Sequence, residues 1–155
     1  MENYNYYQIS QKSRYALRAL LELAIRQSSQ PVGVKKVSEA QNIPTRFLEV
    51  ILSELRQGGF VHSVRGKTGG YLLARSPDRI TAGQIIRFVE SGKHDRVPGG
   101  RADAQHSVIT GDYAESWLFN EVDRAVSGIL DTVTLDDMVQ QEMKKQDGYG
   151  ANYVI

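Results

Sequence analysis

Cysteine is absent from the 155 residues of the sequence. Its absence excludes disulfide scaffolds, thiolate zinc fingers, cysteine-ligated iron–sulfur clusters and cysteine nucleophiles, and it leaves His, Asp and Glu as side-chain metal ligands. Long apolar runs are also missing, and residues 1–7 lack the basic-then-apolar order of a signal peptide, so neither membrane insertion nor secretion is expected. These absences predict a cytoplasmic globular protein with one ordinary core and no membrane partner.

Charge is divided unevenly along the chain, although the formal net charge is only +1. Residues 1–80 carry 12 Lys and Arg against 6 Asp and Glu, whereas residues 81–155 carry 7 against 12. A basic half joined to an acidic half indicates that the first half faces a polyanion. An uneven scatter of solvated surface charge is the alternative explanation.

Three helices are predicted in the basic half, at residues 10–27, 34–41 and 44–57. Ser10 is suited to capping the first helix, and Pro44 is well placed in the first turn of the third. The short connection through Asn42 and Ile43 gives the last two helices the proportions of a helix-turn-helix.

A β-hairpin with a basic, glycine-rich tip at residues 65–70 (RGKTGG) is predicted next, because β-favouring residues flank that segment. A fourth helix follows over residues 81–90, with Thr81 as its cap. Three helices, a hairpin and a helix are the order of a winged helix-turn-helix. The predicted fold class is therefore mainly α with a small β-hairpin wing, within a DNA-binding domain at residues 1–91.

The acidic half is predicted to contain an irregular loop at residues 92–112, a long helix with a short closing helix at 113–145, and a flexible tail at 146–155. The long helix carries an apolar stripe, and a stripe outside the main domain needs a partner surface. A second copy of the chain is the commonest such partner, so this helix is expected to mediate dimerisation. The expected contact residues are Trp117, Leu118, Val122, Ala125, Ile129 and Val133.

Candidate DNA contacts lie at the start of the third helix and at the hairpin tip. The major groove of B-DNA accepts a helix whose first side chains, here Thr45, Arg46 and Glu49, face base edges. Arg46 suits a guanine edge or a phosphate, and Glu49 suits cytosine N4. The alternative interpretation of Glu49 is an ordinary solvated helix residue. Arg65, next to Gly66, suits the narrow minor groove. Candidate phosphate contacts are Lys67, Arg56, Lys12, Arg14 and Lys36.

No enzyme activity is predicted. Gly66-Lys67-Thr68 resembles the end of a phosphate-binding P-loop, but Val61 stands where that loop needs glycine and a strand follows instead of a helix. The three histidines do not stand beside a nucleophile in a catalytic motif.

Two sensing alternatives and one alternative function remain open. His94, Asp95, Asp103 and His106 lie in the irregular loop and offer N and O ligands, although a polar loop without a metal is the favoured interpretation. A pocket near Trp117 is a second possible site for a small ligand, although aromatic residues in that setting are more often core or dimer contacts. A protein-interaction adaptor is the alternative function.

Several segments of the sequence together form a recognisable pattern. They are residues 13–18 (SRYALR), 47–49 (FLE), 55–56 (LR), 59–61 (GFV), 63–75 (SVRGKTGGYLLAR) and 80–83 (ITAG), and then Trp117 and residues 134–137 (TLDD). With these segments the sequence closely resembles the Rrf family of winged-helix transcription regulators. The hairpin motif RGxxGGYxL is specific to this family and lies within a match that covers about residues 10–90.

The resemblance implies a homodimeric winged-helix transcription factor whose long helices cross between subunits. The protein is therefore expected to be a repressor that binds a palindromic operator in double-stranded DNA. The base-contacting positions of the family fall at Pro44, Arg46, Phe47 and Glu49, and its minor-groove pair at Arg65 and Gly66. Pro44 and Arg46 replace the small hydroxyl residues often found there, so the operator preference of other members is not carried over. Many members bind an iron–sulfur cluster through three cysteines in the loop that corresponds to residues 92–107. This sequence has none, and no cofactor is expected.

The branch of the family that regulates cysteine metabolism is similar in lacking those cysteines, and its repressors act in complex with cysteine synthase. The last residues of the sequence, Asn152, Tyr153, Val154 and Ile155, resemble the isoleucine-ended tail with which serine acetyltransferase enters that enzyme. An aliphatic carboxylate after an aromatic residue suits an anion-binding pocket. Cysteine synthase is therefore an expected partner, and a frayed terminus without function is the alternative.

Overall fold

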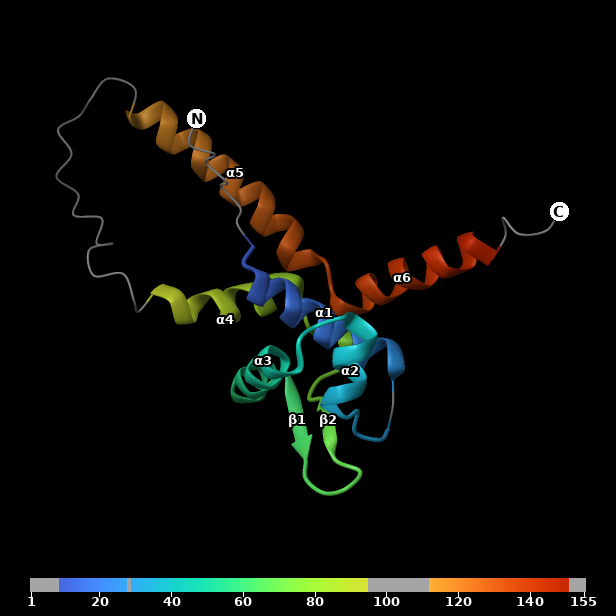
Figure 1. Ribbon diagram of the computed structural model, residues 1–155. Helices are drawn as coiled ribbons and strands as arrows, with labels where there is room; N and C mark the ends of the chain where they lie inside the picture. The colour runs from blue at the N-terminus through green and yellow to red at the C-terminus, as the bar shows by residue number, and fades with distance from the viewer. Residues whose placement is uncertain (1–8, 28, 95–111, 151–155) are drawn as a thin grey trace.

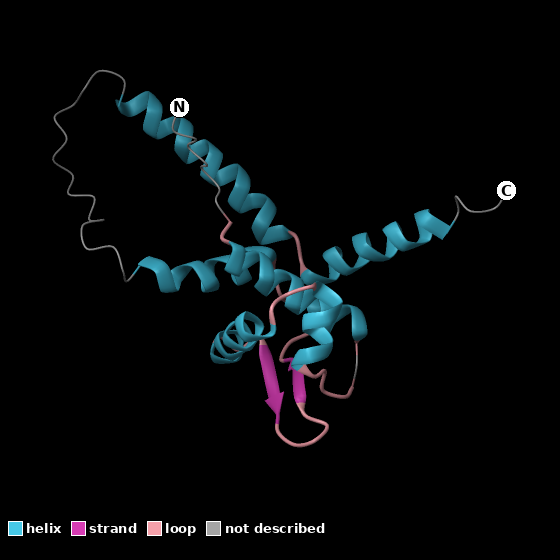
Figure 2. Cartoon of the chain, viewed as in Figure 1, coloured by secondary structure: helices cyan, strands magenta, loops and turns pink. Residues whose placement is uncertain are grey.

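The computed structural model describes residues 9–27, 29–94 and 112–150 (Figure 1). A helix-turn-helix and a two-stranded wing form its body, and two further helices project from that body (Figures 1 and 2). The elements in order are α1 (Gln11–Arg26), α2 (Val34–Gln41), α3 (Thr45–Gln57), β1 (Val61–Val64), β2 (Gly70–Leu73), a 3₁₀ turn at Pro77–Arg79, α4 (Ala82–His94), α5 (Asp112–Thr132) and α6 (Leu135–Gly150). The predicted fold class is confirmed.

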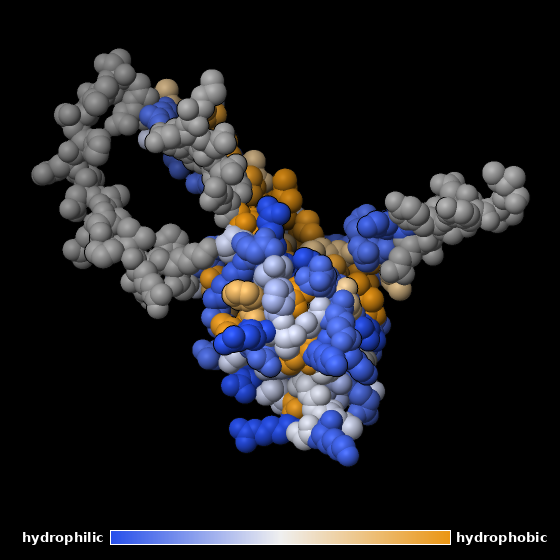
Figure 3. All heavy atoms as spheres, in the orientation of Figure 1, coloured by the Kyte–Doolittle hydropathy of each residue, from blue (hydrophilic) through white to orange (hydrophobic). Residues whose placement is uncertain are grey.

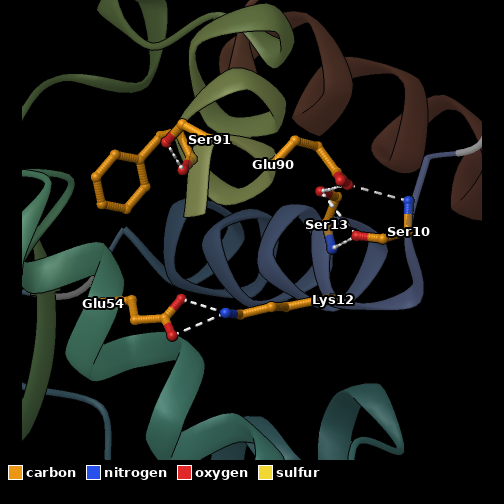
Figure 4. A network of polar contacts seen from close by, with 7 residues as sticks. Ser10, Lys12, Ser13, Glu54, Glu90 and Ser91 are labelled. Atoms are coloured by element: carbon orange, nitrogen blue, oxygen red, sulfur yellow. Dashed lines mark hydrogen bonds and ion pairs between the residues drawn. The ribbon is translucent and has the colours of Figure 1, made fainter. Parts of the chain in front are cut away.

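Helix α1 is the centre of the core, where it packs against α2, α3, α4 and α6. The Ser10 side chain caps it by accepting a hydrogen bond from the Ser13 backbone N–H at 3.1 Å, as predicted. Polar side chains fix its start against the neighbouring helices, since Ser13 donates to Glu90 of α4 at 2.6 Å and Lys12 forms an ion pair with Glu54 of α3 (Figure 4). The position of α3 is therefore fixed by both packing and charge.

The turn between α2 and α3 is built from residues that tolerate its backbone. Asn42 has a φ of 49°, in the left-handed region where asparagine is favoured among non-glycine residues. The Ser38 hydroxyl donates to the Ile43 carbonyl at 2.7 Å and lies 2.9 Å from the Thr45 hydroxyl. These bonds set the direction in which α3 leaves the turn.

The connection from α5 to α6 is held against the start of α4. Thr81 and Thr134 form an isolated antiparallel bridge, and the backbone N–H of Ala82 donates to the Val133 carbonyl at 2.9 Å. Thr134 then caps α6, because its hydroxyl oxygen accepts a hydrogen bond from the Asp137 backbone N–H at 3.1 Å. In return, the backbone N–H and the hydroxyl of Thr134 both donate to the Asp137 carboxylate at 2.9 Å. Those bonds lower the pKa of Asp137, so the carboxylate stays ionised at the positive end of the helix.

Two predicted boundaries were wrong. Helix α4 continues through Gly92 to His94, so the irregular segment does not begin at residue 92. Helix α6 runs to Gly150, so the first part of the predicted tail at 146–155 is helical. One glycine costs a helix only about 1 kcal/mol relative to alanine, and residues 140–147 are mostly good helix formers. The predicted loop residues Asp95, Asp103 and His106 lie outside the described residues.

None of the helices in the described part of the chain combines the length and the hydrophobicity needed to span a bilayer.

Candidate nucleic-acid interface

Helix α3 has one buried face and one exposed face. The side chains of Leu48, Ile51, Leu52 and Leu55 are buried in the core. The predicted DNA contacts of α3 are all exposed: Pro44, Thr45, Arg46, Phe47, Glu49 and Arg56. The buried residues recur at three- and four-residue spacings, which place them on one face of the helix. The exposed side of α3 therefore presents cationic, anionic and apolar side chains together.

The hairpin pairs Val61 with Leu73 and Val64 with Gly70, so its tip comprises residues 65–69. Gly66 has a φ of +118°, a conformation that side-chain-bearing residues rarely adopt. Arg65, Gly66 and Lys67 are all exposed, and the tip ends in hydrophilic side chains (Figure 3).

The wing is fixed to the helix-turn-helix through its backbone. Tyr71 and Val32 exchange two hydrogen bonds of 2.9 Å, immediately before α2. A Cβ atom on Gly70 would lie 2.2 Å from the Val32 carbonyl oxygen, so only glycine permits this approach. Arg56 of α3 also donates to the Ser63 hydroxyl of β1 at 3.2 Å. The exposed face of α3 and the wing tip therefore belong to one rigid unit.

The predicted phosphate contacts differ in their surroundings. Arg14, Lys36 and Lys67 are exposed. Lys12 lies 2.6 Å from Glu54, so its charge is already paired within the protein. We therefore expect Lys12 to contribute less to binding a polyanion than the exposed cations do.

A polar network that was not predicted connects α1 to the helix-turn-helix. Arg18 donates to the backbone carbonyl of Gln41, the last residue of α2, and the Gln41 side chain donates to Glu22 at 2.8 Å. Glu22 is buried and also pairs with Arg26 at 2.6 Å. The only sequence signal was an acidic residue on the apolar side of α1 with Arg four residues later. The network fixes the end of α2.

Five of the six predicted dimerisation residues lie on α5, which projects from the body (Figure 1), and Val133 directly follows that helix. Trp117, Leu118 and Ile129 are 58%, 50% and 62% exposed, respectively. Ala125 is exposed, and Val122 and Val133 are half-buried. Figure 3 shows apolar side chains along the same helix. Large apolar residues in such a row mark an interaction surface.

The structure does not describe the other candidate groups. The side chain of His94 and all of Asn152, Tyr153, Val154 and Ile155 lie outside its described residues. Among residues 9–27, 29–94 and 112–150, no three His, Asp or Glu side chains are placed to share a metal ion.

Comparisons with known proteins agree with this geometry. The family model Rrf2, described as an iron-dependent transcriptional regulator, matches residues 9–141. The HTH-type transcriptional regulator CymR of Bacillus subtilis is 34% identical over 141 residues, which cover 91% of this chain and 96% of CymR. The solved structure of that protein, named the global cysteine regulator of B. subtilis, has a TM-score of 0.71 and covers 87% of this chain and 98% of its own. The solved structure of T. potens IscR has a TM-score of 0.74 at 30% sequence identity, and the match covers 90% of this chain and 91% of the IscR chain.

The family match covers the helix-turn-helix, the wing and α5, which are the elements that carry the exposed cations and the apolar stripe. Its members are transcriptional regulators and not enzymes, so the prediction of no enzyme activity is confirmed. The chain belongs to the Rrf2 family of winged-helix, DNA-binding transcriptional regulators.

Proposed function

We propose that this chain is a cytoplasmic, homodimeric repressor that binds a palindromic operator. One observation supports the proposal: the same chain has an exposed α3 and wing tip and also an exposed apolar stripe on α5. A two-fold dimer through α5 presents two α3 helices to two half-sites, so the operator repeats the symmetry of the protein. A dimer seated on promoter DNA blocks polymerase by occupying the same site.

Within each half-site, α3 lies in the major groove and the wing tip in the adjacent minor groove. Arg46 contacts a guanine edge or a phosphate, and Glu49 accepts a hydrogen bond from cytosine N4. An acidic side chain weakens nonspecific attraction to DNA, so Glu49 is useful only if it adds sequence discrimination. Pro44, Thr45 and Phe47 lie on the same exposed end of α3.

Selection of bound sequences from a random DNA pool tests this assignment. The wild-type protein is expected to enrich an inverted repeat, and Glu49→Ala is expected to lose its preference at one base pair per half-site. The lost discrimination is about 1–3 kcal/mol at that base pair, with nonspecific affinity unchanged or slightly higher. Glu39→Ala is a matched control, since it removes an exposed carboxylate from α2 instead of α3. Enrichment of no sequence by the wild type would contradict the proposal and favour a protein-interaction adaptor.

An iron centre does not fit the described residues. The sequence has no cysteine, and the residues that the structure describes contain no group of three other ligands. Cysteine thiolates are the usual ligands of iron–sulfur clusters, so iron sensing by a cysteine-bound cluster is not part of the proposal.

We further propose that a cysteine synthase controls the repressor through residues 152–155. CymR, a global cysteine regulator, is one relative of this chain, and α6 carries the chain away from the helix-turn-helix (Figure 1). A partner at that end leaves the exposed face of α3 accessible.

Deletion of Tyr153, Val154 and Ile155 is expected to abolish co-purification with cysteine synthase while leaving operator binding by the purified dimer unchanged. Pull-down with the purified enzyme and gel shifts measure the two quantities separately. Substitution of Met143 by alanine, on α6, is the control and is expected to change neither. Retention of the enzyme by the deleted protein would refute the role of these residues.

A further inference from the structure

An apolar groove lies between the start of α1 and the first half of α3. Its volume is about 540 Å³, and it is lined by Gln11, Lys12, Tyr15, Phe47, Val50 and Ile51. Phe47 is 63% exposed and Val50 is 55% exposed, which is unusual for large apolar side chains near a core. Apolar side chains lie among hydrophilic ones over α1 and α3 in Figure 3. The groove therefore adjoins the candidate interface with DNA.

Helix geometry places Val50 beside a predicted base contact. Val50 follows Arg46 by four residues, so their side chains point in directions about 40° apart around the axis of α3. Phe47 lies one turn earlier on the side that faces α1. A helix inserted in the major groove with Arg46 toward the bases thus brings Val50 toward the bases as well. The three groove-lining residues of α3, Phe47, Val50 and Ile51, have no hydrogen-bonding side-chain group, so the α3 wall of the groove suits an apolar edge.

We propose that Val50 and Phe47 form a contact site for the 5-methyl group of thymine. This inference rests on the proposed operator binding and adds a specificity determinant to it. The thymine methyl is the apolar group that a base pair presents in the major groove. The exposed cations Arg46 and Arg14 lie on the same two helices, so the groove continues a surface that is complementary to DNA in charge. The site contributes discrimination between thymine and cytosine that neither Arg46 nor Glu49 provides.

Replacement of operator thymines by deoxyuridine tests the proposal, because it removes the methyl group and keeps the base pair. The operator obtained by selection is used for this test. The wild-type protein is expected to bind it about fourfold more weakly for each contacted methyl group that is removed. This factor corresponds to the burial of one apolar carbon, which contributes about 0.8 kcal/mol. The affected thymine is expected at the same position in both half-sites. Competition gel shifts with singly substituted operators locate it.

Val50→Ala and Phe47→Ala are expected to bind the thymine and deoxyuridine operators equally well, which links the methyl effect to these side chains. Both residues are exposed, so the variants are expected to fold. Met143→Ala, which truncates a 49% exposed side chain on α6, is the control and keeps the fourfold effect.

Two results would overturn the thymine site while leaving the proposed function intact. One is a deoxyuridine effect that is absent from the wild type or unchanged in both variants, with sequence-specific binding retained. The other is a change of oligomeric mass in Val50→Ala or Phe47→Ala without any change in thymine preference, which would assign the groove to a second copy of the chain. Failure to select any operator would instead refute the proposed function and the thymine site together.

Discussion

Replacing Ile129 by aspartate is expected to convert the protein to monomers and to weaken operator binding by at least about 100-fold. Ile129 is 62% exposed on the apolar stripe of α5. In a two-fold dimer, two new carboxylates enter one apolar interface, and each buried ion costs several kcal/mol. Binding falls because a monomer engages one half-site and loses the effective concentration that linkage provides. Sedimentation and gel shifts at matched concentrations measure both effects.

The control for Ile129→Asp places the same charge on the opposite side of the same helix. Asn120 is exposed and precedes Ile129 by nine residues, so it lies about 180° away around the axis. Asn120→Asp is expected to remain dimeric and to bind the operator normally. Circular dichroism of Ile129→Asp is expected to match the wild type, because the replaced side chain is exposed in one chain. A dimeric Ile129→Asp protein with normal affinity would assign dimerisation to another surface.

Local signals explain why most elements were predictable. Ser10 and Thr134 mark helix starts with side chains that bond the backbone of their own first turn, and these interactions span only three residues. Asn42 marks the helix-turn-helix connection because asparagine tolerates the left-handed backbone found there. The burial of Leu48 and Leu52 follows from their spacing. Each of these signals involves residues that are no more than about one helical turn apart in the sequence.

Contacts between distant segments were not predictable in the same way. The network of Arg18, Glu22 and Gln41 joins residues that are about twenty positions apart, and nothing in their local sequence shows that they meet. Gly70 was expected only as a turn residue, whereas its close approach to Val32 depends on how the wing packs against α2. The groove at Val50 was missed for a related reason, since its exposure depends on how far α1 extends over α3.

The second large effect is expected at the wing, where Arg65→Ala should weaken operator binding by about 10- to 100-fold. Arg65 is exposed at the tip, and the backbone pairing of Val32 with Tyr71 holds the hairpin against the helix-turn-helix. A cation presented by a preorganised hairpin loses little conformational freedom on binding, so most of its attraction to the minor groove is retained as affinity. Loss of the side chain leaves this backbone pairing intact.

Salt dependence separates this electrostatic role from a loss of folding. Each cation that no longer neutralises a phosphate reduces the slope of log K against log salt by about 0.9, so a dimer of Arg65→Ala is expected to lose about 1.8. Arg79→Ala removes an exposed arginine from the 3₁₀ turn and is expected to leave the slope unchanged. A misfolded fraction lowers the apparent affinity equally at every salt concentration and does not alter the slope. An unchanged slope in Arg65→Ala would therefore show that the wing tip makes no charged contact with the operator, whatever happens to the affinity.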